Sequence, residues 1–109
     1  MVSNTTGINN SAFGTSALYA NITGNYNTAV GRSSITFNKT GSGNTAIGYG
    51  ALYSDTAGSN NIAIGYLAGN SAQMSNRLWI GSGDSNNAII YGEMLTRPKI
   101  RINGELFVS

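Results

Sequence analysis

The sequence predicts an all-β solenoid, in which the chain winds into stacked coils of 17 residues, followed by a short segment of strands. The first observation is a pattern, Asn-x-Ala-x-Gly, that recurs four times in one register. Its members are Asn10, Asn27, Asn44 and Asn61; Ala12, Ala29, Ala46 and Ala63; and Gly14, Gly31, Gly48 and Gly65. The second observation is composition, because each period is rich in Gly, Asn, Ser and Thr, which favour turns over helix interiors. A fixed short period indicates one structural unit stacked on itself.

Length and charge limit the class of protein. The chain has 109 residues, of which 9% are charged, and a net charge of +2. These values fit a single domain, and so small a charge argues against nucleic acid or a membrane surface as partners. No apolar run approaches the roughly 20 residues of a membrane-spanning helix, so we expect no membrane insertion.

The inventory of reactive side chains argues against catalysis. The chain contains no Cys and no His, which removes disulfides, thiol chemistry and the commonest metal ligands. The acidic residues are Asp55, Asp84, Glu93 and Glu105, and no two of them are close in the sequence. A glycosidase needs a pair of carboxylates. We therefore expect no enzyme, no metal and no cofactor.

The repeats define the middle of the chain. Residues 1–6 are expected to fray, and coils are expected to start near residues 7, 24, 41 and 58 within a roll spanning 7–83. Seventeen residues suit two short strands and two turns per coil. The glycine that follows each repeated strand suits a position with positive φ or close backbone approach.

Alternation within each strand predicts which side chains face inward, because successive strand residues point to opposite faces. We expect the large apolar residues to fill the roll. The expected roll core is Phe13, Val30, Ile47 and Ile64 from the first strand, and Leu18, Ile35 and Leu52 from the second. The column Ser11, Thr28, Thr45 and Ile62 is expected to face inward beside the first group.

The alanine column would then lie on the outside of the roll. Ala12, Ala29, Ala46 and Ala63 present only methyl groups, which suggests that another backbone comes close. A coil of this size buries few apolar side chains, whereas ordering a chain costs about 1.5 kcal/mol per residue. We therefore predict that these alanines form a contact between subunits and that association completes the core.

Residues 75–83 are expected to form an altered last coil. Arg77-Leu78-Trp79-Ile80-Gly81 aligns with the preceding repeat after a step of 16 residues. Trp79 stands in the alanine column, where only a methyl is expected to fit, so the stacking is expected to change there. The favoured interpretation is a cap that closes the apolar stack. The alternative is an aromatic side chain that binds a ligand.

Residues 84–109 leave the period and form a C-terminal strand and hairpin segment. Residues 87–93 are expected to form a strand, and Pro98 to interrupt or begin the next one. Residues 99–108 are expected to form a hairpin around an Asn103-Gly104 turn, since Asn-Gly is the strongest short hairpin signal.

The repeats resemble a known family of fibre proteins. Gly43-Asn44-Thr45-Ala46-Ile47-Gly48 and Asn60-Asn61-Ile62-Ala63-Ile64-Gly65 resemble the YadA-type head repeat of trimeric autotransporter adhesins and of bacteriophage tail fibres. Ile90-Tyr91-Gly92-Glu93 and Ile102-Asn103-Gly104-Glu105-Leu106 are similar to the segment that follows such repeats in tail fibres. Over about residues 7–81, the resemblance implies a left-handed parallel β-roll, three copies of which pack about a threefold axis. It also implies that Ala46 and Ala63 face a neighbouring subunit.

The function expected from this resemblance is structural. We expect a segment of a homotrimeric fibre that serves cell adhesion or host attachment, in a virion tail fibre or on a bacterial cell surface. The alternative is a glycan-binding module of a bacterial trimeric adhesin, with Tyr49, Tyr66, Tyr53 and Trp79 as flat apolar contacts. The expected partners are further copies of the chain and a cell-surface glycan or protein. An ice-binding threonine array is disfavoured, because its column is interrupted and is expected to face inward.

Overall fold

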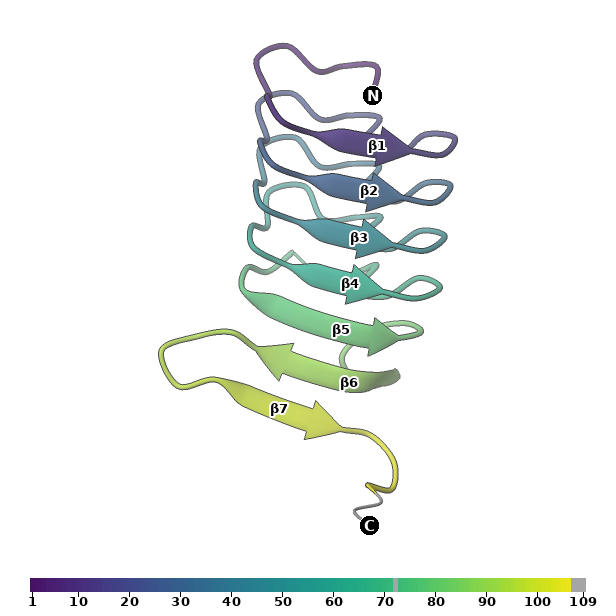
Figure 1. Cartoon of the computed structure of the whole chain (residues 1–109), viewed down its shortest axis with the longest axis vertical. Coiled ribbons are helices and arrows are strands. Elements are labelled where there is room, and N and C mark those ends of the chain that lie inside the picture. The colour runs from purple at the N-terminus through teal and green to yellow at the C-terminus, as the bar shows by residue number, and fades with distance from the viewer. Residues whose placement is uncertain (72, 107–109) are drawn as a thin grey trace.

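The structure is a computed structural model that describes residues 1–71 and 73–106 of the chain. This part contains strands and turns but no helix. The strands are β1 (Ser11–Phe13), β2 (Thr28–Val30), β3 (Thr45–Ile47), β4 (Ile62–Ile64), β5 (Arg77–Gly81), β6 (Ala88–Glu93) and β7 (Lys99–Ile102). They form one sheet in chain order, and the chain enters at one end of the stack and leaves at the other (Figure 1).

Strands β1 to β5 pair in parallel, and their register repeats the period of the sequence. Thr28 pairs with Thr45, and Ala29 with Ala46. The predicted parallel solenoid with coils of about 17 residues is therefore confirmed. Each of the first four coils contains one strand of three residues, not the two strands expected. Turns make up the rest of each coil.

The turns rely on backbone conformations that few residue types adopt readily. Gly48, directly after β3, has a φ of 132°. A side chain there would place its Cβ 2.4 Å from the carbonyl oxygen of Gly65 in the next coil. Glycine at this position lets successive coils approach to the spacing of paired strands.

The same turns hold large apolar residues in the left-handed region. Leu18, Ile35 and Leu52 have φ values of 50°, 46° and 52°. This conformation is unusual for a branched residue such as Ile35. The three side chains are fully buried, so packing in the core holds them in a conformation that costs free energy locally.

The strand side chains face the opposite way from that expected. Ala29, Ala46 and Ala63 are fully buried inside the coils. The prediction that Phe13, Val30, Ile47 and Ile64 form the roll core was wrong, because these four side chains are exposed on the outer face. The Ser11, Thr28, Thr45 and Ile62 column also faces outward, because residues two apart in a strand share a face.

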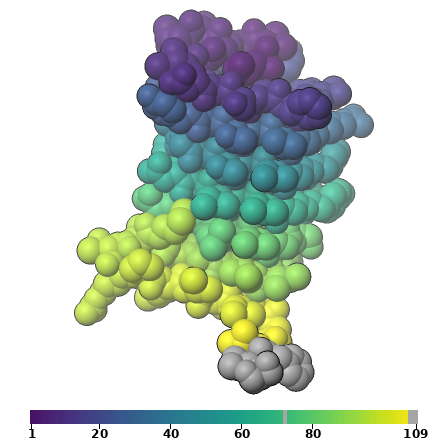
Figure 2. Space-filling model, viewed as in Figure 1, coloured from purple at the N-terminus to yellow at the C-terminus, as the bar shows by residue number. Residues whose placement is uncertain are grey.

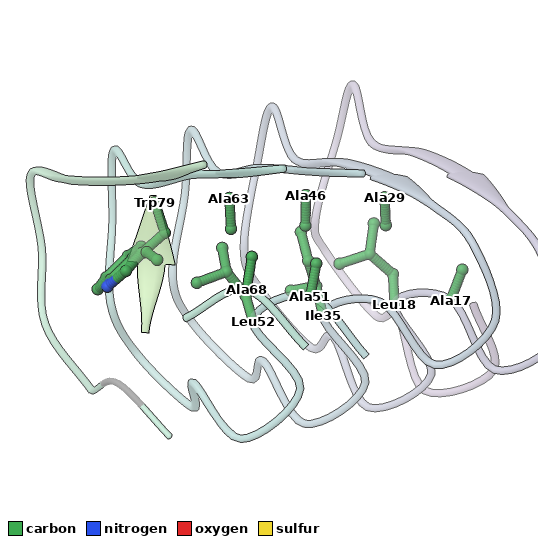
Figure 3. Packing of buried hydrophobic residues seen from close by; sticks show 11 residues of the cluster. Ala17, Leu18, Ala29, Ile35, Ala46, Ala51, Leu52, Ala63, Ala68 and Trp79 are labelled. Carbon is green, nitrogen blue, oxygen red and sulfur yellow. The ribbon is translucent and has the colours of Figure 1, made fainter. Parts of the chain in front are cut away.

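The narrow interior explains this reversal. Leu18, Ile35 and Leu52 extend from the turns toward the strand and meet the alanine methyl groups (Figure 3). Ala17, Ala51 and Ala68 pack beside them. Because these side chains already fill the coil, the strand can contribute only a methyl group, and its larger residues must point outward.

Asparagine side chains link each coil to the next. The Oδ1 atoms of Asn27 and Asn44 accept the backbone N–H groups of Asn44 and Asn61, both at 3.0 Å. The Nδ2 groups of Asn27 and Asn44 donate to the carbonyls of Gly41 and Gly58 at 2.8 and 2.7 Å. The recurring asparagine is therefore a buried group with both of its functions satisfied.

A second amide column runs along another edge of the stack. Asn21 Nδ2 donates to Asn4 Oδ1, and Asn38 Nδ2 donates to Asn21 Oδ1, each at 2.8 Å. Asp55 occupies the next position, 17 residues after Asn38. A carboxylate has no N–H to donate to Asn38, so the pattern of donation from one coil to the preceding one ends there.

The solenoid closes through an exchange of large and small residues. Trp79 takes the alanine position on β5 and is buried, while Gly69 takes the position of Leu52 one coil later. A Cβ on Gly69 would lie 2.8 Å from the indole ring. The indole therefore occupies the space that a leucine fills in other coils (Figure 3). The expectation that stacking changes at Trp79 was wrong, because β5 still pairs in parallel with β4, with Trp79 beside Ala63.

The sheet changes direction one strand later. β6 pairs antiparallel with β5, and β7 pairs antiparallel with β6. β7 thus pairs with the strand before it, and the hairpin expected around Asn103-Gly104 is not formed within the described residues. Phe107 and Val108, in its expected second arm, lie outside them. Figure 2 shows the coils as stacked layers and the segment around β6 and β7 projecting beyond them.

Candidate functional site

An apolar strip crosses the outer face of the whole sheet. Residues paired across adjacent strands lie on the same face, and the register aligns one apolar side chain from every strand. The apolar strip consists of Phe13, Val30, Ile47, Ile64, Ile80, Ile90 and Ile102. Phe13 is 79% exposed, and Val30, Ile47 and Ile64 are each exposed by close to two fifths.

A second outer column runs beside the apolar strip and changes character along the sheet. It begins with Ser11, Thr28 and Thr45 and continues with Ile62 and Leu78. Its hydroxyl groups therefore lie toward the N-terminal end, and the outer face is most apolar on β4 and β5. The column is visible in the sequence, but it was expected to face inward, so its place on the outer face was not predicted.

The alanines cannot serve as the subunit contact that the sequence suggested. Ala29, Ala46 and Ala63 are enclosed by their own coils, so no neighbouring chain can touch them. Ala12 is exposed, because the residues before it place no strand beside β1. The unpartnered surface of the strands is the opposite face, which carries the apolar strip.

Two predicted tyrosines stack on the turns that follow the strands. The rings of Tyr49 and Tyr66 are 5.4 Å apart between centroids, with planes inclined by 12°. Both are exposed. Tyr53 lies on the same turn as Tyr49 and packs edge-on against Phe37, with centroids 5.0 Å apart. The structure therefore brings Tyr49 and Tyr66 together, with Tyr53 close by.

Trp79 is separate from these tyrosines and is closed to solvent. Its side chain is 1% exposed and points into the coil. Its nearest aromatic partner is Tyr91 on β6, at 5.9 Å between centroids. The prediction of Trp79 as a glycan contact was wrong, because a sugar cannot reach a ring that is enclosed by the core.

The tyrosines border two neighbouring hollows along the turns, which we together name the turn groove. One hollow, of about 380 Å³, is lined by Arg32, Ser33, Tyr49, Gly50, Tyr53 and Leu67. A second, of about 360 Å³, is lined by Tyr66, Leu67, Asn70, Ser82, Gly83, Asp84 and Asn87. Leu67 borders both hollows. Sequence patterns do not single out Asn70 and Asn87, because polar residues in turns are common whether or not they border a hollow.

A third hollow lies against the C-terminal strands and has mixed charge. It has a volume of about 260 Å³ and is bordered by Tyr91, Glu93, Lys99 and Arg101, together with Ile100. The Arg101 guanidinium lies 5.3 Å from the centre of the Tyr91 ring and donates to the carbonyl of Ser85. These contacts already engage the arginine within its own chain.

Among the described residues, one acid is strongly buried, and it is isolated from other reactive groups. Asp55 is 1% exposed, and this burial raises the pKa of its carboxyl above the usual value of 3.8. It accepts hydrogen bonds from the Gly58 N–H at 2.7 Å and from Asn61 Nδ2 at 3.0 Å. Both contacts are internal to the stack, so the residue is part of the scaffold.

Metal-binding clusters and membrane-spanning helices are both absent from the residues that the structure describes. There, no group of three or more acidic, Cys or His residues is arranged to hold a metal ion. Nor does any helix in these ranges have the length and apolar character needed to cross a bilayer. Comparison with known proteins returned no matching family model, curated protein or solved structure.

Proposed function

We propose that this chain is a structural segment of a homotrimeric fibre used for attachment to a cell surface, of the kind its repeats resemble in tail fibres and trimeric adhesins. The observation that supports this most directly is the apolar strip. A contiguous exposed apolar surface on a soluble protein commonly marks a contact with another macromolecule.

The shape of the apolar strip favours copies of the same chain as the partner. Its side chains lie in one row that follows the solenoid from end to end, so parallel copies can align coil against coil. Faces of two β-sheets pack about 10 Å apart with interdigitating side chains. Three copies around a common axis, as the resemblance implies, would bury each row against its neighbours and close the ring.

Solution mass tests this proposal. Light scattering behind a sizing column should give about three times the 11.3 kDa mass of one chain. Ile64→Asp should abolish the trimeric mass, because it places a charge in the middle of the apolar strip. Ile22→Asp is a matched control, since Ile22 and Ile64 are both 37% exposed and Ile22 lies on a turn away from the sheet.

Two results would contradict the proposal. One is a folded monomer of 11.3 kDa for the unaltered chain. The other is an Ile64→Asp variant that retains the trimeric mass. A stable monomer would leave the outer face in water, and its Thr28 and Thr45 hydroxyls would then justify a measurement of thermal hysteresis for ice binding.

A further inference from the structure

The turn groove consists of two neighbouring hollows that share Leu67 and lie along the carboxyl ends of the strands. Each coil turns sharply after its strand, and these turns stand in a row beside the sheet (Figure 1). Tyr49 borders the first hollow and Tyr66 the second, and their rings stack on each other. The stacked pair therefore lines both hollows, with one ring on each.

The second hollow combines an aromatic ring with several hydrogen-bonding groups. Tyr66 offers a flat apolar surface, and Asn70 and Asn87 offer amides that can both donate and accept. Asp84 supplies a carboxylate beside them. Sugar rings present apolar C–H faces together with hydroxyls that donate and accept, which is the chemistry that this set of groups complements.

Backbone contacts hold this part of the groove in place. The N–H of Gly69 donates to the Gly83 carbonyl at 2.8 Å, and the N–H of Gly83 donates to the Tyr66 carbonyl at 3.3 Å. The Asp84 Oδ1 atom accepts the N–H of Asn86 at 2.9 Å. The loop with the carboxylate is thus tied to the turn with the ring, so little ordering is needed on binding.

From this arrangement we infer that the second hollow of the turn groove binds a neutral oligosaccharide. The second hollow has a carboxylate and no cation among its lining residues, so an anionic sugar would meet uncompensated repulsion there. None of the groove residues belongs to the apolar strip. This inference goes beyond the proposed fibre role and does not depend on it.

The experiment is a titration of the isotope-labelled protein with maltohexaose, cellohexaose and chitohexaose, followed by amide NMR. At least one of these neutral sugars should shift the resonances of Tyr66, Asn70 and Asn87 in a saturable way. Tyr66→Ala should weaken that binding by roughly tenfold, because it removes the stacking surface. Asp84→Asn should also weaken it, because it replaces one acceptor oxygen by a donor.

The controls separate binding from folding and assembly. Tyr26→Ala removes a tyrosine that is 62% exposed, against 61% for Tyr66. Tyr26 precedes its strand, so it lies at the amino ends of the strands, whereas the turn groove lies at their carboxyl ends. It should leave binding unchanged, and all three variants should keep the solution mass of the parent. The inference is overturned if none of the three sugars shifts the groove at millimolar concentration. It is equally overturned if Tyr26→Ala weakens binding as much as Tyr66→Ala does.

Discussion

At the scale of single residues, the residue type at each repeated position is set by the contacts that it makes with the neighbouring coil. Asn44 is required because one side chain must accept an N–H and donate to a carbonyl at the same time. Gly48 is required because any Cβ would meet the backbone of the next coil. Where one residue departs from its column, the departure should therefore carry a measurable free energy.

Ser34 is the first such departure. It lies in the column of Ala17, Ala51 and Ala68, is fully buried, and has a hydroxyl with no hydrogen-bond partner among the described residues. An unpaired buried hydroxyl costs about 1–3 kcal/mol. Ser34→Ala should therefore raise the free energy of unfolding by about 1 kcal/mol, measured by urea denaturation. Ser33→Ala, on the partly exposed neighbouring position, should change it little, and an unstable Ser34→Ala variant would contradict this explanation.

Asp55 is the second departure, and it should make stability depend on pH. Burial raises the pKa of its carboxyl in the folded state, so the folded chain holds this proton more tightly than the unfolded chain. The resulting stabilisation is complete below the unfolded-state pKa and is lost as pH rises through the raised folded-state pKa. The free energy of unfolding should therefore fall as the pH rises across this window.

Asp55→Asn should remove that fall and stabilise the protein at neutral pH. The new amide would donate to Asn38 Oδ1, as Asn38 donates to Asn21, so the column would continue. Asn61 Nδ2 would lose the carboxylate oxygen but keep the Met74 carbonyl as its acceptor, at 2.6 Å. Urea midpoints from acid to neutral pH measure the effect. Asp84→Asn changes the charge equally at a half-buried position outside the column. If that control flattened the pH profile as much as Asp55→Asn, the column argument would fail.

At the scale of elements, β5 closes the solenoid through the exchange of size between Trp79 and Gly69. Trp79→Ala should cost about 3–5 kcal/mol of unfolding free energy, because it leaves a cavity beneath Leu52. Gly69→Leu alone should also destabilise, because its Cβ would lie 2.8 Å from the indole ring. The left-handed backbone is no obstacle by itself, since Leu52 adopts it one coil earlier.

The double variant should recover much of this loss. With both changes the last coil would carry the alanine and the leucine of a regular repeat, so the two costs should be strongly non-additive. Thermal or urea unfolding of the four proteins in this cycle measures the coupling. Additive costs would show that Gly69 and Trp79 do not fill the same space.

At the scale of the whole molecule, the period was readable from the sequence and the inside of the coil was not. The 17-residue spacing of Asn, Ala and Gly determines the stack and its register, because parallel strands repeat that spacing directly. A strand of three residues such as Thr45–Ile47 has an apolar side chain on each face, so alternation alone does not show which face is buried. The usual rule that the larger side chain is buried fails here, because Leu52 enters from the turn and leaves space only for a methyl.

The repeat spacing also made part of the candidate site predictable. Tyr49 and Tyr66 share a column, so their contact follows from the repeat. Asp84 and Asn87 lie beyond the last repeat, where the sheet reverses direction, and no periodicity relates them to Tyr66. The hydrogen bonds that Gly83 makes with Gly69 and Tyr66 hold them there, and a sequence pattern does not reveal these bonds.

The stack is closed by the substitution of only two repeat positions, at Gly69 and Trp79, so the length of this protein can be changed by adding whole repeats. Every coil before that pair offers the next one the same amide, glycine and alanine contacts, so an extra 17-residue unit inserted upstream of Gly58 meets matching neighbours on both sides. Each insertion would extend the stack by about 4.8 Å, the spacing of paired strands. The number of repeats therefore sets the length of the stack in steps of one coil, and Trp79 determines the coil at which the stack ends.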